Sequence, residues 1–320
     1  MSIFDQKVIK YEMKPLSSLE KVFPDETPVY RMECQMLSGL WGETVSFQVA
    51  YTGDFVMRER LDVRVVSELA EHVHVRTVEM VPVGRATNGI VDDNYLKTTS
   101  GLYPDLLKDL KDGKVIVYSR QWRSLWVDVD ITNEIPAGEY EIELQLIKEG
   151  EVVCSAKQKV TVIGTELPKL DIMHTEWMHA DCLADYYHVE VFSEEHWKLL
   201  ENYFQEYVKR DCNMMLTPLF TSPLDTAIGL ERTTCQLIDV EVKDGEYVFG
   251  FEKLKRWIDL CKKCGIEYFE MSHLFSQWGA KYAPKVVATV NGKKEKIFGW
   301  HTPAVGEYTK FLESFLPQLT

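Results

Sequence analysis

One short stretch of the chain combines histidine, acidic and aromatic residues directly after an apolar run. The run covers residues 170–173, and the stretch that follows it begins at His174. Carboxylates and imidazoles hydrogen-bond hydroxyl groups and transfer protons, while tryptophan and tyrosine rings cover the apolar faces of a ligand. Such side chains at the C-terminal end of a strand are typical of a binding site. The substrate-binding candidates here are His174, Glu176, Trp177, His179, Asp181 and Tyr187.

A second group of similar residues follows two later apolar segments. Thr217 ends the segment 213–217, and Ser272 follows the segment 266–271. Because the strands of successive βα units end at one edge of a sheet, we expect the residues that follow these segments to lie near the first group. The further substrate-binding candidates are His273, Trp278, Trp300 and His301.

Strands and helices that alternate over residues 169–320 must position these candidates. Strands are predicted at 170–173, 213–217 and 266–271, and each is followed by a helical pattern. Three such βα units predict a parallel sheet covered by helices. Three strands cannot close a (β/α)₈ barrel, which needs about 250 residues. The segment is therefore either a half-sheet fold or the front part of a longer chain.

Capping residues mark the helices of this second part. Ser193, followed by two glutamates, predicts a helix start, and Thr302-Pro303 predicts another. Gly265 predicts the end of one helix and Pro317 the end of the last. Two hairpins are predicted as insertions, about Asp244-Gly245 and about Asn291-Gly292.

Residues 1–165 predict a different architecture, in which short runs alternate apolar and polar residues between turn residues. Period-two alternation with almost no helical stretch is typical of an antiparallel β-sandwich. The connection 82–110 is long, and we expect Tyr103 within it to pack on a neighbouring domain rather than on a ligand. The boundary is predicted at 164–168, which gives a multidomain α and β chain. The predicted strands are 45–51, 61–65, 72–76, 115–118, 125–129, 140–146, 152–153 and 159–162.

Composition limits the partners and the compartment. The net charge is −14 and the pI about 5.1, which disfavour nucleic acid and anionic membranes as partners. The N-terminus shows no signal-peptide pattern, and no apolar run has the length of a membrane span. The seven cysteines show no disulfide spacing, which favours reduced thiols and a cytoplasmic protein. The Cys261/Cys264 pair is interpreted as two thiols on one helix, and a homo-oligomer is compatible with the sequence.

Several motifs resemble those of a known family. The stretch from His174 to Cys182, the segment 213–218, Ser222-Pro223-Leu-Asp-Thr226 and Glu231-Arg232 are similar to bacterial proteins with domain of unknown function 4091. That domain is related to glycoside hydrolase family 123, the β-N-acetylgalactosaminidases. The N-terminal motifs Tyr103-Pro-Asp, Trp126-Val-Asp-Val and Pro136-Ala-Gly-Glu-Tyr resemble the sandwich that precedes the barrel in these proteins.

The resemblance implies a β-sandwich at 1–165 followed, at 169–320, by the first three βα units of an incomplete TIM-type (β/α)₈ barrel that acts on glycosides. In the family, an Asp-Glu pair follows the fourth strand, where the Glu protonates the leaving oxygen and the Asp orients the 2-acetamido group of the substrate. That pair is expected beyond Thr320, so no catalytic residue is assigned. If the chain is complete and active, Glu176 and Glu270 are the carboxylate candidates.

Two other functions stay open from the residues alone. A non-catalytic carbohydrate-binding module would bind an oligosaccharide or a glycoconjugate glycan without turnover. A metal-dependent hydrolase would use His174, His179, Asp181 and His273, although these lack a compact ligand spacing. The leading interpretation is a glycoside hydrolase-like protein that needs no cofactor.

Overall fold

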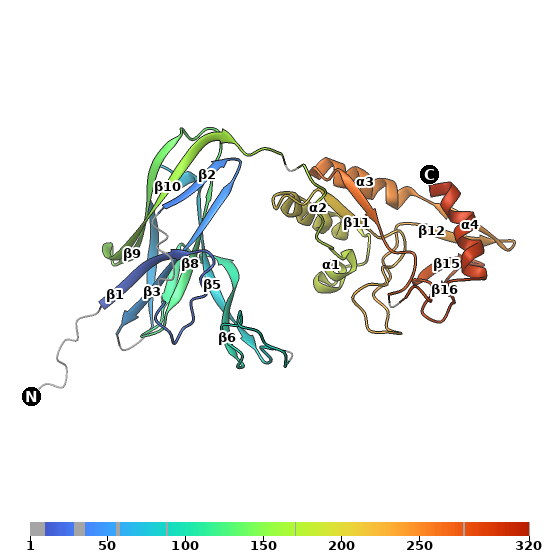
Figure 1. Cartoon of the computed structure of the whole chain (residues 1–320), viewed down its shortest axis with the longest axis horizontal. Coiled ribbons are helices and arrows are strands. Elements are labelled where there is room, and N and C mark those ends of the chain that lie inside the picture. Colours follow the sequence, from blue (N-terminus) through green and yellow to red (C-terminus); the bar gives the residue numbers. More distant parts are fainter. Residues whose placement is uncertain are drawn as a thin grey trace, which may run out of the picture. The chain divides into compact units, whose positions relative to one another are not determined.

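The computed structural model describes residues 10–28, 36–55, 58–87, 89–169, 171–277 and 279–319 (Figure 1). The chain divides into two compact units, Met1–Lys169 and Leu170–Thr320. None of the helices in the described part of the chain combines the length and the apolar character that a membrane-spanning helix requires.

The described residues of the first unit form two five-stranded sheets, drawn in blue to green in Figure 1. One sheet has the order β1-β3-β8-β5-β6 and is antiparallel throughout. The other has the order β2-β10-β9-β4-β7 and is antiparallel except where β2 runs parallel to β10. The strands are β1 (Lys10–Ser17), β2 (Met36–Trp41), β3 (Thr44–Asp54), β4 (Glu59–Val66), β5 (Val73–Val83), β6 (Gly101–Asp109), β7 (Lys114–Val117), β8 (Arg123–Asp130), β9 (Gly138–Lys148) and β10 (Glu151–Glu166), with a 3₁₀ turn η1 (Ala70–His72) before β5.

Both sheets contribute to one core. Leu144 and Leu146 of β9 are fully buried, and they belong to the same cluster as Val127 and Val129 of β8 in the other sheet. Alternation along each strand explains this arrangement, because every second side chain points to the same face. Each strand predicted by alternation overlaps an observed strand, although 72–76 begins one residue before β5 and 115–118 ends one residue after β7. The predicted segments 152–153 and 159–162 belong to the single long β10. The strands β1, β2 and β6 were missed.

The long connection predicted at 82–110 is mostly a hairpin. β5 runs to Val83 and pairs with β6, which begins at Gly101, so the connection between strands spans only 84–100. The Tyr103 ring lies edge-on to Phe23 of the same unit, with centroids 5.7 Å apart. Its contact is therefore within the first unit, whereas packing on a neighbouring domain was expected.

The described residues of the second unit contain four α-helices and two small sheets. A two-stranded parallel sheet joins β11 to β14, and a four-stranded sheet has the order β13-β12-β15-β16. The elements are α1 (Ala180–Tyr187), α2 (Glu194–Val208), β11 (Met214–Thr217), β12 (Asp239–Lys243), β13 (Glu246–Gly250), α3 (Glu252–Cys264), β14 (Tyr268–Met271), β15 (Val286–Val290), β16 (Lys293–Phe298) and α4 (Glu307–Leu319).

Helix caps lie where the sequence predicts them for α2 and α3. The Ser193 hydroxyl accepts a hydrogen bond from the backbone N–H of His196 and caps α2. Gly265 ends α3 in the left-handed conformation with φ 105°. Its Cα lies so close to Val208 that an added Cβ would come within 3.3 Å of that side chain. The prediction of Gly265 as a C-terminal cap is confirmed.

The strand predicted at 170–173 does not form in the described residues 171–173. Ile172 and Met173 are each 64% exposed, so this apolar run has no core to face. Hydrogen bonds to the start of β11 hold this segment in place. Asn213 Nδ2 donates to the Ile172 carbonyl, and the backbone N–H groups of Asn213 and Met214 donate to the His174 carbonyl. Of the three predicted strands, β11 and β14 therefore pair with each other, and the described residues 171–173 join neither of them as a strand.

Both predicted hairpins form and join into one sheet. Asp244-Gly245 and Asn291-Gly292 have positive φ at both positions, as two-residue hairpin turns with the twist of the strands require. Strand β12 of the first hairpin then runs parallel to β15 of the second.

The last helix begins later than predicted. Residues 302–304 pair in an extended manner: the Ala283 N–H donates to the Thr302 carbonyl, and Tyr282 forms an isolated bridge with Pro303. The helix α4 begins at Glu307, and Val305, which would lie in the first turn of a helix that started at Thr302-Pro303, is 72% exposed. Pro317 lies inside the final turn of α4 instead of after it.

An aromatic cluster between α4 and the four-stranded sheet stabilises the second unit. Phe311 and Phe315 of α4 are fully buried, and Phe249 of β13 lies within 5.5 Å and 5.2 Å of their ring centroids. Burial of each such side chain contributes about 1.5–3 kcal/mol. This packing fixes the two hairpin insertions on the unit.

Candidate sugar-binding site

The candidate site lies at the carboxyl ends of β11 and β14. These strands pair in parallel from Met214 opposite Tyr268 to Thr217 opposite Met271. Just beyond them, the Ser272 N–H donates to the Thr217 carbonyl at 2.9 Å. The sheet therefore directs the segments after 217 and after 271 to one edge, as the sequence predicts.

Trp177 contacts two side chains, Glu270 of β14 and His273 of the segment that follows β14. Its indole Nε1–H donates to Glu270 Oε2 at 2.9 Å. Its ring meets His273 edge to face, with centroids 5.5 Å apart. The Trp177 side chain is 46% exposed, so one part of the ring is held by the protein and another faces solvent. Three residues singled out in the sequence therefore form one cluster.

Tyr207 of α2 fixes the loop that carries Trp177. Its hydroxyl accepts from the Glu176 N–H at 2.7 Å and lies 2.7 Å from the Met214 carbonyl and 2.9 Å from the Glu176 carbonyl, which compete for its single proton. The Thr175 hydroxyl lies 3.3 Å away. Burial raises the pKa of Tyr207, so the hydroxyl stays protonated and keeps its donor. The loop is thereby tied to the start of β11.

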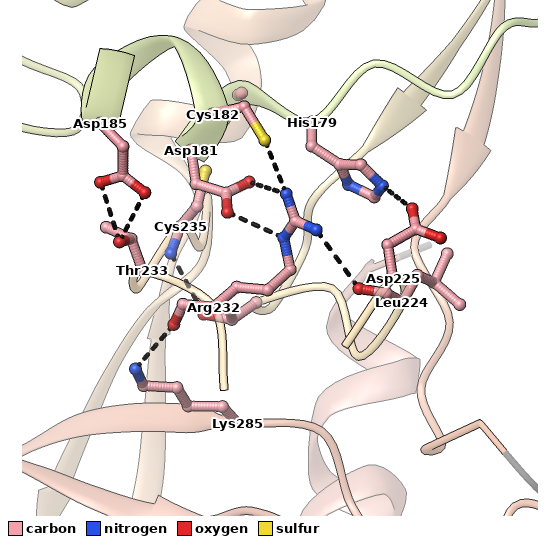
Figure 2. Close-up of polar contacts among 12 residues, drawn as sticks. His179, Asp181, Cys182, Asp185, Leu224, Asp225, Arg232, Thr233, Cys235 and Lys285 are labelled. Carbon is pink, nitrogen blue, oxygen red and sulfur yellow. Dashed lines mark hydrogen bonds and ion pairs between the residues drawn. The ribbon is translucent and has the colours of Figure 1, made fainter. Parts of the chain in front are cut away.

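His179 pairs with an acidic residue from the loop after β11 (Figure 2). Its Nε2 lies 2.6 Å from Asp225 Oδ2, and its side chain is only 10% exposed while that of Asp225 is 62% exposed. Asp225 has φ 57°, a left-handed conformation that aspartate tolerates better than most residues. The pair joins the N-terminal end of α1 to the loop 218–238.

Asp181 forms a second and more buried link between the same segments (Figure 2). Arg232 Nε donates to Asp181 Oδ2 at 2.8 Å and Nη2 donates to Oδ1 at 3.3 Å. The same Nη2 lies 2.9 Å from the Cys182 Sγ, and Nη1 lies 3.4 Å from the Leu224 carbonyl. Both carboxylate oxygens of Asp181 are engaged by Arg232, so Asp181 positions the loop.

The remaining contacts of Figure 2 extend this link along the loop. The Thr233 hydroxyl lies 2.9 Å from both carboxylate oxygens of Asp185. Lys285 Nζ donates to the Arg232 carbonyl at 3.1 Å. The loop is thus tied to α1 on one side and to the segment before β15 on the other.

The first two candidates of the stretch lie beside the start of β11. His174 Nδ1 contacts the Asp211 carbonyl at 3.1 Å, and its Nε2 lies 3.6 Å from Glu176 Oε1. The Glu176 side chain is 76% exposed. Neither touches the Trp177 ring cluster through a described hydrogen bond.

The other candidates are spread over the second unit. Tyr187 bonds to Tyr203 through their hydroxyls at 3.0 Å, and this hydrogen bond, with burial, raises the pKa of Tyr203 to about 12. Trp300 is 8% exposed and contacts Tyr282, whereas His301 is exposed. Trp278 lies outside the described residues.

The residues considered for a metal do not share one centre. His174, His179 and His273 have separate partners, namely Glu176, Asp225 and Trp177. In the described ranges, no group of three or more His, Cys, Asp or Glu side chains is placed to hold a metal ion. Asp181 is occupied by Arg232.

Sequence reasoning missed the partners of the site. Asp225, Arg232 and Tyr207 hold the candidate residues in place, yet none was named as a site residue. Asp225 and Arg232 do lie in two motifs that carry the family resemblance, so a signal was present. Ser222 of the same loop is 7% exposed, and its hydroxyl has no hydrogen-bond partner among the described residues.

The comparisons with known proteins concern the family and the fold of the chain. Residues 177–320 match the family model of the catalytic domain of glycoside hydrolase 123. Among solved structures, the chain resembles a family 123 glycoside hydrolase from Clostridium perfringens, with a TM-score of 0.70 and 15% identity. The match covers 97% of this chain and 56% of that one, so this chain spans little more than half its length. The second unit is glycoside hydrolase-like, and at this identity the structural likeness shows the fold alone.

Other solved structures are more distant. A β-glucosidase from Listeria innocua is 10% identical, with 51% of this chain and 18% of that chain covered and a TM-score of 0.23. The N-terminal domain of PorA is 11% identical, with 45% and 98% covered and a TM-score of 0.23. Neither similarity supports an argument about this protein. The comparison with curated proteins gives no match.

Proposed function

We propose that this protein is a glycoside hydrolase-like protein whose second unit binds a sugar at the carboxyl ends of β11 and β14. The carrying observation is the half-exposed Trp177 ring, held by Glu270 and His273 in the part of the chain that matches the family 123 catalytic domain. An aromatic face suits the apolar side of a sugar, and nearby carboxylate and imidazole groups suit its hydroxyls. The ligand is an oligosaccharide or a glycoconjugate glycan.

The proposed substrate class is a β-N-acetylhexosaminide, with a galactosaminide preferred. In the substrate-assisted reaction, a carboxylic acid protonates the leaving oxygen while a neighbouring carboxylate orients the 2-acetamido group, whose oxygen attacks the anomeric carbon. We assign that carboxylate pair to no residue of 1–320. Glu270 already accepts the Trp177 indole proton, which supports a role in holding the ring.

The domain assignment is part of the same proposal. Residues 1–165 form a β-sandwich support, and residues 169–320 form the first part of a TIM-type (β/α)₈ barrel. The shared core of the two N-terminal sheets and the parallel pair β11-β14 support it. Outside the Trp177 cluster, His174, Glu176, Tyr187, Trp300 and His301 remain proposed sugar contacts. His179 and Asp181 act through the loop that they hold.

The indole N–H signal of Trp177 provides a direct test. We would titrate the protein with N-acetylgalactosamine and follow the tryptophan indole signals in ¹H–¹⁵N spectra, with Trp177→Phe used to assign the signal. We expect the Trp177 signal to shift and saturate. Tyr268→Ala is the matched control, because Tyr268 is a half-exposed aromatic residue at the opposite end of β14. It should leave the titration unchanged.

Two outcomes would change the proposal. If no N-acetylhexosamine shifts the Trp177 signal, the sugar site does not include this ring and the proposal fails. An assay of nitrophenyl release from an N-acetyl-β-galactosaminide addresses the chemistry separately. We expect sugar binding without release, and release by the chain would place the catalytic acid within residues 1–320.

A further inference from the structure

A cavity of about 510 Å³ opens in the second unit, and no residue of the Trp177, Glu270 and His273 cluster lines it. Three segments distant in the sequence form its walls together with Lys253 of α3: 189–192 between α1 and α2, 233–240 before and within β12, and 287–294 of the second hairpin. Its volume falls within the range of about 300–1,000 Å³ typical of small-ligand sites.

Phe192 forms one wall in a strained conformation. Its φ is 61°, a left-handed value that is rare for a bulky residue and costs of order 1–3 kcal/mol. The backbone N–H of Phe192 donates to His196 Nδ1 at 2.9 Å, and His196 Nε2 donates to the Ala180 carbonyl at 3.0 Å. The described contacts therefore hold the strained residue in place.

His196 must be neutral to hold Phe192 in this way, because only the neutral imidazole has an acceptor nitrogen. The side chain is fully buried, and burial lowers the pKa of His196. The Phe192 ring stacks on Trp197, with centroids 5.2 Å apart and an interplanar angle of 26°. This side of the cavity is thus preorganised.

The opposite wall is also fixed before any ligand arrives. Gln236 Nε2 donates to the Val287 carbonyl at 2.8 Å, and its Oε1 accepts from the Val287 N–H at 2.9 Å. The Gln236 side chain therefore pairs with the backbone of β15 in the manner of a neighbouring strand. Ala288 and Thr289 follow directly along this wall.

Polar groups remain available in the lining. Among the described residues, the hydroxyls of Thr234 and Thr289 form no hydrogen bond, and neither Glu190 nor Lys294 forms an ion pair. The lining contains two lysines, Lys253 and Lys294, and two acidic residues, Glu190 and Asp239. Lys253 Nζ lies 2.7 Å from Asp239 Oδ1. The site thus has no net charge that would select an ion.

We propose that this cavity is a second sugar-binding site, separate from the Trp177 site. A neutral ligand with hydroxyls on its rim and an apolar ring face matches free threonine hydroxyls, a fixed aromatic wall and an aliphatic floor. The aliphatic residues of the lining are four valines and one alanine. This inference goes beyond the proposed function, because its ligand class is argued from its own lining.

The second site is connected to the first through one loop. Thr233 and Thr234 line the cavity, and the adjacent Arg232 binds Asp181. A glycan that reached both sites would gain affinity through a high effective concentration of its second residue.

The experiment follows backbone amide signals of Val191, Thr234 and Thr289 during titration with N-acetylgalactosamine, N-acetylglucosamine or galactose. We expect at least one sugar to shift them saturably, in the wild type and in Trp177→Ala alike. Thr289→Tyr, which fills the cavity, should abolish these shifts and keep the shift of the Trp177 indole signal. Thr289→Ser is the matched control and should retain them. Thr234→Val should weaken binding about fivefold through loss of one hydrogen bond.

The outcomes separate this site from the proposed function. Saturable cavity shifts without any Trp177 shift would support the second site and contradict the first. Trp177 shifts without cavity shifts from any of the three sugars would overturn the second site alone. Glycine serves as a zwitterionic probe, and cavity shifts with glycine but not with sugars would show that the ligand class is wrong.

Discussion

The Asp181 carboxylate and the Arg232 guanidinium form a two-point ion pair that solvent barely reaches, with side chains 8% and 9% exposed. Asp181 also lies in the first turn of α1, where the helix dipole favours a negative charge. The pair joins α1 to a loop that is 51 residues distant in the sequence. The pair therefore fixes α1 relative to the loop 218–238.

Replacement of Arg232 by glutamine should destabilise the second unit strongly. The substitution leaves the Asp181 carboxylate buried without its cation, and loss of one partner of a buried pair costs about 3–5 kcal/mol. Urea unfolding followed by tryptophan fluorescence measures the free energy of unfolding. Trp197 and Trp257 lie in the core of the second unit and report on its unfolding.

An exposed ion pair provides the control for that change. Lys263 and Glu201 lie 2.5 Å apart, with side chains 66% and 30% exposed. Lys263→Gln should lower the free energy of unfolding far less than Arg232→Gln, because solvent screens the pair. If both variants lose the same free energy of unfolding, burial does not make the Asp181–Arg232 pair more stabilising than an exposed pair.

Tyr207→Phe should lower stability by about 1–3 kcal/mol, since it leaves the Glu176 N–H and the Met214 carbonyl without their hydroxyl partner. The same change should weaken sugar binding at Trp177, because the loop that carries the ring loses its anchor. Thermal unfolding and the indole titration measure the two effects.

Tyr203→Phe is the matched control for Tyr207. Among the described residues its hydroxyl bonds only to Tyr187, and Tyr203 is 38% exposed. We expect little change in unfolding and in the affinity for sugar at Trp177. A Tyr207→Phe variant that behaves like Tyr203→Phe would contradict the anchoring role.

Stability of the second unit should fall as the pH drops below about 6.5, the ordinary pKa of histidine. Burial depresses the pKa of His196 in the folded state, so the unfolded chain binds a proton that the folded chain does not. The loss begins at the unfolded pKa and grows as the pH falls toward the folded one. The free energy of unfolding, measured at several pH values, should show this dependence. His196→Asn should lower the number of protons taken up on unfolding by up to one.

Local signals made much of the second unit predictable. Ser193 and Gly265 mark helix ends through contacts with their own helices, and Asp244-Gly245 fixes its hairpin through backbone conformation alone. These devices act within a few residues, so the sequence displays them directly. The Thr302-Pro303 signal failed because Pro303 pairs with Tyr282 in an extended segment, a contact 21 positions away in the chain that no local pattern records.

Long-range pairing limited the prediction of the site. The apolar run 170–173 resembles a strand, but whether it pairs depends on β11, about forty residues later. Asp181 looked available as a ligand because its partner, Arg232, is remote in the sequence. The gathering of Trp177, Glu270 and His273 was predictable in outline, since parallel strands end at one edge of a sheet.

The contact between His179 and Asp225 should control the mobility of the loop 218–238 rather than global stability. Asp225 is 62% exposed, so Asp225→Ala removes a partner of His179 without opening the core. Hydrogen exchange at the amides of residues 224–230 should accelerate about tenfold or more, while the unfolding midpoint changes little. Asp225→Asn is the matched control, because asparagine tolerates the left-handed φ and keeps an acceptor for the His179 ring. Slow exchange in both variants would show that Arg232 alone holds the loop, whereas fast exchange in both would show that the negative charge of Asp225, and not only its acceptor, is required.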